Sequence, residues 1–313
     1  MNFFSNYRNE ITISIKKLYD DCSFFFDILI IFMSNVKMIK MTFGGNMKVT
    51  VVAPKGKMGR LITKVLSENK DFEIVAGVGR PWSEYIGHDI GIVAGLGQPL
   101  GVPVVDNLEN VIDKCDVIID FSNVELSMKV IESALKHNKA LVCGTTGFSD
   151  ENLKTIYKAS EEIPLLFASN TSRVVNLMNI LLELTAKAIG NISDIEIIEM
   201  HDALKKDAPS GTSKEMGEVI ANAMKKELKD IAVYGRLGMG ERIPGTIGYH
   251  SLRAGDISSS HTVMFGLMGE RLEITHHAYN WECFARGACE GALYLKNKKP
   301  GLYNMKDVLK IEQ

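Results

Sequence analysis

The feature that most restricts the fold is a regular alternation of short apolar segments with amphipathic segments, beginning at Met47. Residues 48–53 predict a strand, and the following residues repeat apolar side chains at helical spacing. Further strands are predicted over residues 72–78, 116–121, 140–143 and 165–168. Such alternation is typical of a parallel sheet covered by helices. We therefore predict the α/β class, with a Rossmann-like dinucleotide-binding domain over residues 47–170.

The turn after the first predicted strand has the character of a phosphate site. Gly56 and Gly59 let the backbone approach a pyrophosphate, and the helix that follows offers its N-terminus to the negative charge. A strict G-x-G-x-x-G is absent, because Ala53 stands at the first glycine position. Lys55 and Lys57 add positive charge, which supports phosphate binding and would equally suit a solvated helix start.

Arg80 follows the second predicted strand, about twenty residues beyond the glycine turn, where an NAD-specific fold usually has Asp or Glu. No carboxylate stands at this point to repel a 2′-phosphate, and Arg80 can pair with one bidentately. We therefore predict that NADPH is at least as good a cofactor as NADH. The alternative is that Arg80 simply precedes Pro81 in a surface loop.

Small polar residues follow three of the later strands. They are Ser122 and Asn123, the run 144–147 (G-T-T-G), and the run 169–171 (S-N-T). Ligands bind at the carboxyl edge of open parallel sheets. Each run alone is also an ordinary turn with a helix cap, but three together favour a cofactor crevice. The glycine-rich residues 87–101 are predicted to be a loop.

Residues 201–213, H-D-A-L-K-K-D-A-P-S-G-T-S, contain the most reactive combination of side chains. The imidazole of His201 is a proton donor near neutral pH, and Lys205 places a fixed positive charge beside it. Thr212 with Glu215 predicts a capping box at the start of a helix. A helix N-terminus attracts anions, so a carboxylate or phosphate ligand is expected here. The alternative is a polar loop before a well-capped helix.

The remaining segments predict an α+β substrate and oligomerisation domain over residues 171–280. A long helix over residues 174–189 precedes a strand at 194–200, and later strands are predicted to be antiparallel, over residues 232–234, 245–253, 258–267 and 271–278. One face of such a sheet is commonly open, which favours oligomer formation. A helix over residues 281–295 begins a C-terminal segment, 281–313, that we expect to return to the first domain.

Composition excludes several classes of protein. The net charge of −2, without concentrated basic segments, argues against a nucleic-acid partner. The five cysteines are scattered and form no C-x-x-C pair, so we predict reduced thiols in a cytoplasmic protein without a metal site or disulfides.

The first 46 residues differ from the rest. Their apolar run, 24–33, is much too short to span a bilayer, and no membrane association is predicted. Residues 43–46 could be encoded by a purine-rich ribosome-binding site, so we expect synthesis to start at Met47 and treat residues 1–46 as a non-native or disordered extension. The alternative is an amphipathic anchor or a regulatory arm.

From Met47 to the C-terminus the chain resembles the 4-hydroxy-tetrahydrodipicolinate (dihydrodipicolinate) reductases of lysine and diaminopimelate biosynthesis. The segments that carry the resemblance are A-P-K-G-K-M-G-R (53–60), G-T-T-G (144–147), E-I-I-E-M-H (196–201), K-K-D-A-P-S-G-T (205–212), G-E-R-I-P-G-T-I-G (240–248) and G-E-R-L-E-I-T-H (269–276). The resemblance implies an oxidoreductase that reduces a cyclic imine dicarboxylate with NADPH or NADH, and a homotetramer.

The resemblance also implies roles for individual residues. His201 would be the catalytic proton donor and Lys205 the catalytic lysine. Substrate binding would fall on Asp202, Ser210, Gly211, Thr212 and Thr146. The cofactor would contact Ala53, Pro54, Lys55, Gly56, Lys57, Met58, Arg80, Phe121, Gly144, Thr145, Thr146, Ala168, Ser169, Asn170 and Thr171.

Asp202 departs from the family pattern, which usually has a second histidine directly after the first. A carboxylate beside a dianionic substrate repels it by about 1 kcal/mol or more, unless Asp202 points away and orients His201 or Lys205. Two other functions stay open. One is an NAD(P)-dependent amine dehydrogenase of the diaminopentanoate type, and the other is a non-catalytic nucleotide-sensing or assembly protein.

Overall fold

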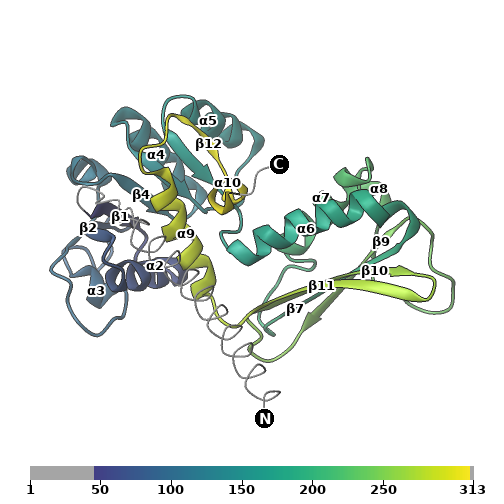
Figure 1. Ribbon diagram of the computed structural model, residues 1–313. Helices are drawn as coiled ribbons and strands as arrows, with labels where there is room; N and C mark the ends of the chain where they lie inside the picture. The colour runs from purple at the N-terminus through teal and green to yellow at the C-terminus, as the bar shows by residue number, and fades with distance from the viewer. Residues whose placement is uncertain (1–45, 311–313) are drawn as a thin grey trace, which may run out of the picture. The chain divides into compact units, whose positions relative to one another are not determined.

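The computed structural model describes residues 46–310 (Figure 1). The predictions made for residues 1–45 lie outside this range. Within residues 46–310, no helix has both the length and the apolar character that a membrane span requires.

A seven-stranded sheet forms the first half of the structure, in the order β12-β6-β5-β4-β1-β2-β3. All of its neighbouring strands run parallel. Its strands are β1 (Met47–Val52), β2 (Phe72–Val78), β3 (Val104–Val105), β4 (Val117–Asp120), β5 (Ala140–Cys143), β6 (Pro164–Phe167) and β12 (Gly301–Tyr303). Apart from Lys48, the residues of the central strands β1 and β4 are buried, as expected of a parallel sheet covered on both faces. The predicted Rossmann-like fold is therefore confirmed.

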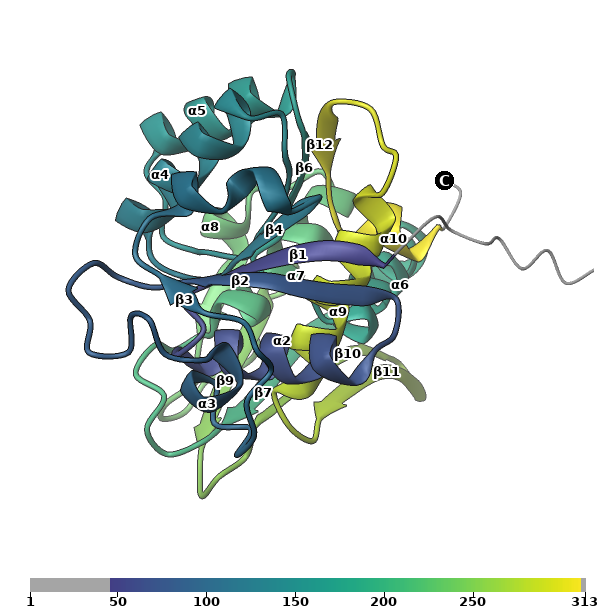
Figure 2. The same cartoon turned by 90° about the vertical axis from the view of Figure 1, so that its left-hand side faces the viewer.

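Helices cover both faces of this sheet (Figure 2). On one face, α2 (Lys57–Glu68) and α9 (Glu282–Leu295) contribute Ile62, Leu66 and Ala288 to a buried cluster with β1. On the other, α4 (Val124–Lys136) and α5 (Asp150–Ser160) contribute Ile131 and Ile156. Short helices complete this half: α3 (Ile90–Val93), α10 (Met305–Leu309) and the 3-10 turns Leu108–Asn110 and Ile112–Lys114. Residues 87–101 are thus not entirely a loop, because α3 lies within them.

The turn between β1 and α2 is tight. Ala53 has a positive φ of 54°. This conformation favours glycine, which explains why the G-x-G-x-x-G pattern has glycine at this position. Gly59 lies inside α2 and not at the turn, which corrects the sequence prediction. A Cβ on Gly59 would meet the Ala53 carbonyl oxygen at 2.1 Å, so glycine lets the helix pack directly on the turn.

The second half contains a five-stranded sheet in the order β11-β10-β7-β9-β8. Its strands are β7 (Asp194–His201), β8 (Ala232–Tyr234), β9 (Ile247–Arg253), β10 (Ser259–Leu267) and β11 (Glu270–Ala278). The prediction of antiparallel strands is only partly right. β10 is antiparallel to β7 and β11, whereas β9 is parallel to β7 and β8.

One face of the second sheet is covered by α6 (Arg173–Ile189) and α7 (Gly211–Ala223) (Figure 1). Inward side chains of β7, such as Ile195 and Ile197, pack there against Leu182 and Met216. The same inward face carries Glu199 and His201, because alternate residues of a strand share a face. The strand thus delivers two ionisable side chains to the interior. The remaining elements are the short helix α8 (Leu228–Ile231) and the 3-10 turn Gly190–Ile192.

Candidate active site

A cavity of about 830 Å³ lies among the turns that follow the parallel strands, the end of β7 and the start of α7. The two sheets both contribute to its wall. It is lined by Met58, Phe121, Gly144, Thr146, Ser169, Asn170, Thr171, His201, Lys205, Asp207, Ser210, Gly211, Thr212, Glu215, Glu218, Ser258, Ser259, Trp281 and Phe284. Its volume is within the range of small-molecule and cofactor sites.

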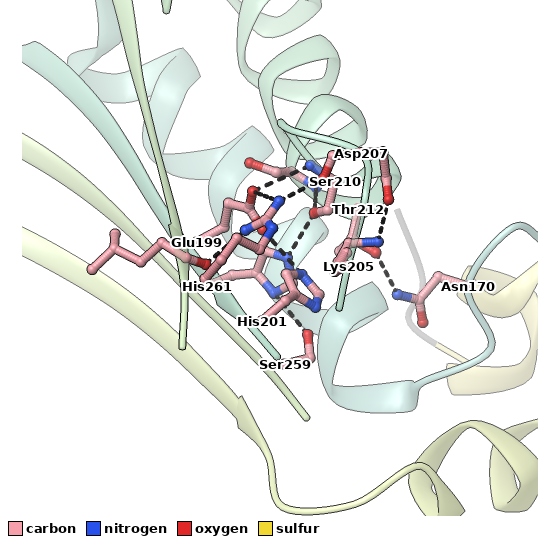
Figure 3. A network of polar contacts seen from close by, with 12 residues as sticks. Asn170, Glu199, His201, Lys205, Asp207, Ser210, Thr212, Ser259 and His261 are labelled. Carbon is pink, nitrogen blue, oxygen red and sulfur yellow. Dashed lines mark hydrogen bonds and ion pairs between the residues drawn. The ribbon is translucent and has the colours of Figure 1, made fainter. Parts of the chain in front are cut away.

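The N-terminus of α7 opens into this cavity. Ser210 is the N-cap residue, and its hydroxyl accepts a hydrogen bond from the Ser213 amide at 3.1 Å. Gly211 leaves the space beside the first turn open, since a Cβ there would meet nothing within 4 Å. Thr212 accepts a hydrogen bond from the Asn170 side-chain amide at 3.0 Å (Figure 3). The helix end therefore offers backbone N–H groups to an anion.

The predicted capping box of Thr212 and Glu215 is wrong. Ser210, two residues earlier, caps the helix, and the Glu215 carboxyl instead accepts hydrogen bonds from Ser169 at 3.0 Å and Asn179 at 3.1 Å. Burial raises the pKa of Glu215. This carboxyl thus connects the start of α7 to the turn after β6.

His201 ends β7 and is buried, with 7% of its surface exposed. Its Nε2 lies 3.0 Å from Oε2 of Glu199, which is fully buried. The ring of His261, on β10, packs edge-on against His201 with centroids 5.4 Å apart (Figure 3). Burial, together with the neighbouring His201, lowers the pKa of His261 to about 3, so its ring is neutral.

Lys205 lies in the segment between β7 and α7, and its Nζ pairs with the Asp207 carboxylate at 2.8 Å. This ion pair lowers the pKa of Asp207. A substrate carboxylate bound to Lys205 would compete with Asp207 for the ammonium group.

The sequence-predicted residues divide into two groups. The cavity wall includes His201, Lys205, Ser210, Gly211, Thr212, Thr146, Met58, Phe121, Gly144, Ser169, Asn170 and Thr171. Absent from that wall are Ala53, Pro54, Lys55, Gly56, Lys57, Arg80, Thr145, Ala168 and Asp202. Most of the second group lies at the first turn and the end of β2, where an extended dinucleotide would continue beyond the cavity.

Asp202 is not on the cavity wall, and its role in substrate binding stays a prediction. Its Oδ1 accepts the Leu204 amide at 2.9 Å, and its charge opposes the lowering of the Lys57 pKa that burial causes. The ion-pair partners of the His201 and Lys205 side chains are Glu199 and Asp207, respectively, while the Lys205 amide donates to the Asp202 carbonyl oxygen at 3.3 Å.

Several site residues were not predicted from sequence. Two aromatic side chains, Trp281 and Phe284, line the cavity, and Lys57 stacks over the Trp281 ring at 3.3 Å from its centroid. The other unpredicted wall residues are Asp207, Glu215, Glu218, Ser258 and Ser259. Behind the wall, Glu199 had a usable signal, since it stands two residues before His201 on the same strand. His261 had none, because its place depends on strand pairing.

Among residues 46–310, one group could in principle bind a metal ion. Glu199, His201 and His261 each offer a ligand atom, and these three atoms lie within 4.8 Å of one another. The Arg253 guanidinium already contacts Glu199 at 2.8 Å. This fixed positive charge opposes binding of a second cation at the same carboxylate.

The doubly wound sheet, the cavity at its carboxyl edge, and the adjoining imidazole, lysine and helix N-terminus define a class of protein: an enzyme that binds a dinucleotide beside a small anionic ligand. Comparison with known sequences identifies the particular family. Residues 47–171 match the N-terminal model of dihydrodipicolinate reductase, and residues 174–309 match its C-terminal model. The chain belongs to the dihydrodipicolinate reductase family, as predicted from its motifs.

Individual relatives agree with this assignment. A 4-hydroxy-tetrahydrodipicolinate reductase from Hahella chejuensis (strain KCTC 2396) is 46% identical over 263 residues, which is 84% of this chain and 98% of the relative. A dipicolinate-bound dihydrodipicolinate reductase from Paenisporosarcina sp. TG-14 has a TM-score of 0.66 at 26% identity, over 84% of this chain and 99% of that one. An amine dehydrogenase from Mycobacterium smegmatis, with a TM-score of 0.55 and 13% identity over 84% and 96% of the two chains, shares the fold alone.

Proposed function

We propose that this chain catalyses the NADPH- or NADH-dependent reduction of 4-hydroxy-tetrahydrodipicolinate to tetrahydrodipicolinate in lysine biosynthesis through diaminopimelate. One observation carries the proposal: His201, Lys205 and the N-terminus of α7 line the same cavity as the turns after β4, β5 and β6. A dianionic substrate and a dinucleotide would meet there. The family assignment and the 46% identity to a reductase support the same reaction.

The first turn fits a dinucleotide pyrophosphate. Gly56 caps α2 without a side-chain hydrogen bond, so N–H groups at the start of this helix are left for a ligand. Gly144 lets the Phe121 ring pack directly on the turn after β5, because a Cβ there would meet that ring at 2.1 Å. We therefore propose that the residues predicted at these turns bind the cofactor.

The chemistry of the chain's own residues follows from their positions. Conversion of the 4-hydroxy substrate to tetrahydrodipicolinate also releases the hydroxyl group as water, which leaves a conjugated, imine-like ring. Reduced pyridine nucleotide, when bound, would supply a hydride to that ring. Because Nε2 of His201 faces Glu199, the imidazole would donate its proton from Nδ1 to the negative charge that develops on the substrate. Lys205 and the N–H groups at Gly211 and Thr212 would hold the two carboxylates and keep the ring in register.

A coupled assay tests the proposal. A synthase forms hydroxy-tetrahydrodipicolinate from pyruvate and aspartate semialdehyde, and the loss of reduced-nucleotide absorbance is followed. Oxidation that depends on both the synthase and this protein supports the reductase. Folded, nucleotide-binding protein that gives no such oxidation would refute it and favour the amine dehydrogenase alternative, which a diaminopentanoate substrate would then test.

Arg80 is expected to confer acceptance of NADPH. Glu84 is paired with Lys55 at 2.9 Å. The negative charge of Glu84 is therefore compensated and would repel a 2′-phosphate less strongly. In Arg80→Ala, KM for NADPH should rise about tenfold, equivalent to one charged hydrogen bond, while KM for NADH stays within about twofold. Steady-state kinetics with both nucleotides measure this, and NADH is the internal control. An equal rise for both would contradict a role at the 2′-phosphate.

Asp202→His is expected to leave kcat/KM unchanged or to improve it. Asp202 lies off the cavity wall and binds the Leu204 amide, so its removal takes away a negative charge without removing a substrate contact. Asp202→Asn, which keeps an acceptor for that amide, is the matched control. A large loss in both variants, measured in the coupled assay, would show that the carboxylate itself is needed.

We also propose that the chain forms a homotetramer through the face of the second sheet that α6 and α7 leave uncovered. Leu252 on β9 pairs with Met200 of β7, which places it on this uncovered face, and it is 43% exposed. Light scattering should give a tetramer mass, and a charged substitution at Leu252 should lower it.

A further inference from the structure

Glu199 is a buried carboxylate in direct contact with the proposed proton donor. It lies on β7 two residues before His201, so both side chains occupy the same face of the strand. Its exposed fraction is 0%. An ionised carboxylate in such a place is costly unless charged and polar partners surround it.

Three groups supply that compensation: His201 and Ser210, both labelled in Figure 3, and Arg253. Oε2 of Glu199 lies 3.0 Å from His201 Nε2, an ion-pair contact that lacks hydrogen-bond geometry. Oε1 accepts hydrogen bonds from Nη2 of Arg253 at 2.8 Å and from the Ser210 backbone amide at 3.3 Å. Burial alone would raise the pKa of Glu199, but the contacts with His201 and Arg253 lower it to about 2. The carboxylate therefore carries a permanent negative charge.

Arg253 extends the same network to the segment that carries Lys205. It lies on β9 opposite His201 in the parallel pairing of β7 with β9. Its Nη2 also donates to the Asp207 backbone carbonyl at 2.6 Å. The Glu199–Arg253 pair thus contacts the imidazole, the Lys205 segment and the N-cap of α7.

We propose that Glu199 is a positioning residue that holds the His201 ring, the Ser210 N-cap and, through Arg253, the Lys205 segment in one working arrangement. This rests on the proposed function, in which His201 donates the proton. With Nε2 beside Glu199, the ring presents Nδ1 to the substrate, and the carboxylate places its negative charge next to the ring. The arrangement follows the same logic as a carboxylate that orients a catalytic histidine.

Other charged groups around His201 do not supply this function. His261 is neutral and packs edge-on against the ring. Lys205 is positive and pairs with Asp207, and Arg253 is positive and bound to Glu199. Among the side chains described here, Glu199 is thus the group that supplies negative charge directly to the imidazole.

The test compares Glu199→Gln with wild-type protein in the coupled assay over a range of pH. Gln keeps an acceptor for Arg253 and Ser210 but removes the charge. We expect kcat to fall about 10- to 100-fold with KM changed less than about threefold, and the high-pH limb of the kcat profile to move to lower pH. Glu199→Asp, which restores the charge at shorter reach, should recover part of kcat and the wild-type profile.

Glu196→Gln is the matched control. Glu196 lies on the opposite face of β7 and contacts Arg242 at 3.0 Å and His250 at 2.7 Å. It shares strand, charge and partner types with Glu199 but does not contact His201, so its loss should move neither kcat nor the pH profile.

Three outcomes would overturn the proposal. In the first, Glu199→Gln keeps the wild-type kcat and pH profile. In the second, Glu199→Gln and Glu196→Gln lower kcat equally without moving the profile. In the third, purified wild-type protein holds stoichiometric zinc that Glu199→Gln loses. If Glu199→Gln does not fold, as judged by circular dichroism, Glu199→Asp decides, because a reduced kcat with normal nucleotide binding is required. Inactive wild-type protein would instead refute the proposed function itself.

Discussion

Glutamine in place of His201 is expected to lower kcat about 10²- to 10⁴-fold, the usual contribution of a general acid. Glutamine fills similar space but cannot donate a proton as an acid does. Because the ring is buried and contacts Glu199 and His261, the loss should appear in kcat, whereas KM for nucleotide should change little. Synthase-coupled steady-state kinetics measure both quantities.

His137→Gln is the control for this prediction. His137 also contacts carboxylates, Glu109 at 3.0 Å and Asp113 at 3.1 Å, but it is the C-cap residue of α4 and is not part of the cavity wall. It should retain wild-type kcat. If His201→Gln kept more than about a tenth of wild-type kcat, proton donation by His201 would be refuted and another acid, Glu215 first, would have to be considered.

The first sheet could be predicted from sequence because its signals are local. Apolar runs between turn residues identified β2 and β5 with their observed bounds, Phe72–Val78 and Ala140–Cys143. The second sheet was harder, because strand direction depends on pairing between distant segments. Ile247–Arg253 reads as a strand in isolation, but nothing in it states that it runs parallel to β7.

The site residues also differ in whether local sequence could identify them. The 201–213 motif was found from its own residues, and His201, Lys205 and Ser210 do line the cavity. The capping box failed because the Glu215 carboxyl is used by Ser169, 46 residues away. His261 and Trp281 reach the site through strand pairing and the start of α9, which no local spacing reveals.

Replacing Lys205 with alanine is expected to lower kcat/KM about 10²- to 10³-fold, comparable to loss of one preorganised donor in a water-poor site. The Lys205 side chain is only partly exposed, and its ammonium group pairs with Asp207 at 2.8 Å. A substrate carboxylate would take the place of that aspartate, so removing the lysine removes a charge-assisted contact and leaves Asp207 to repel the dianion. The coupled assay at low substrate concentration measures kcat/KM directly.

Lys206→Ala separates this specific contact from general electrostatic attraction. Lys206 is adjacent, carries the same charge, is exposed and is not on the cavity wall. If the net positive field alone attracted the dianion, both variants would lose similar, salt-sensitive amounts of activity. A loss confined to Lys205→Ala would instead locate the effect at the contact between the ammonium group and the substrate carboxylate. Adding Asp207→Asn to this variant should then restore part of kcat/KM, because it neutralises the carboxylate that repels the dianion once the lysine is missing.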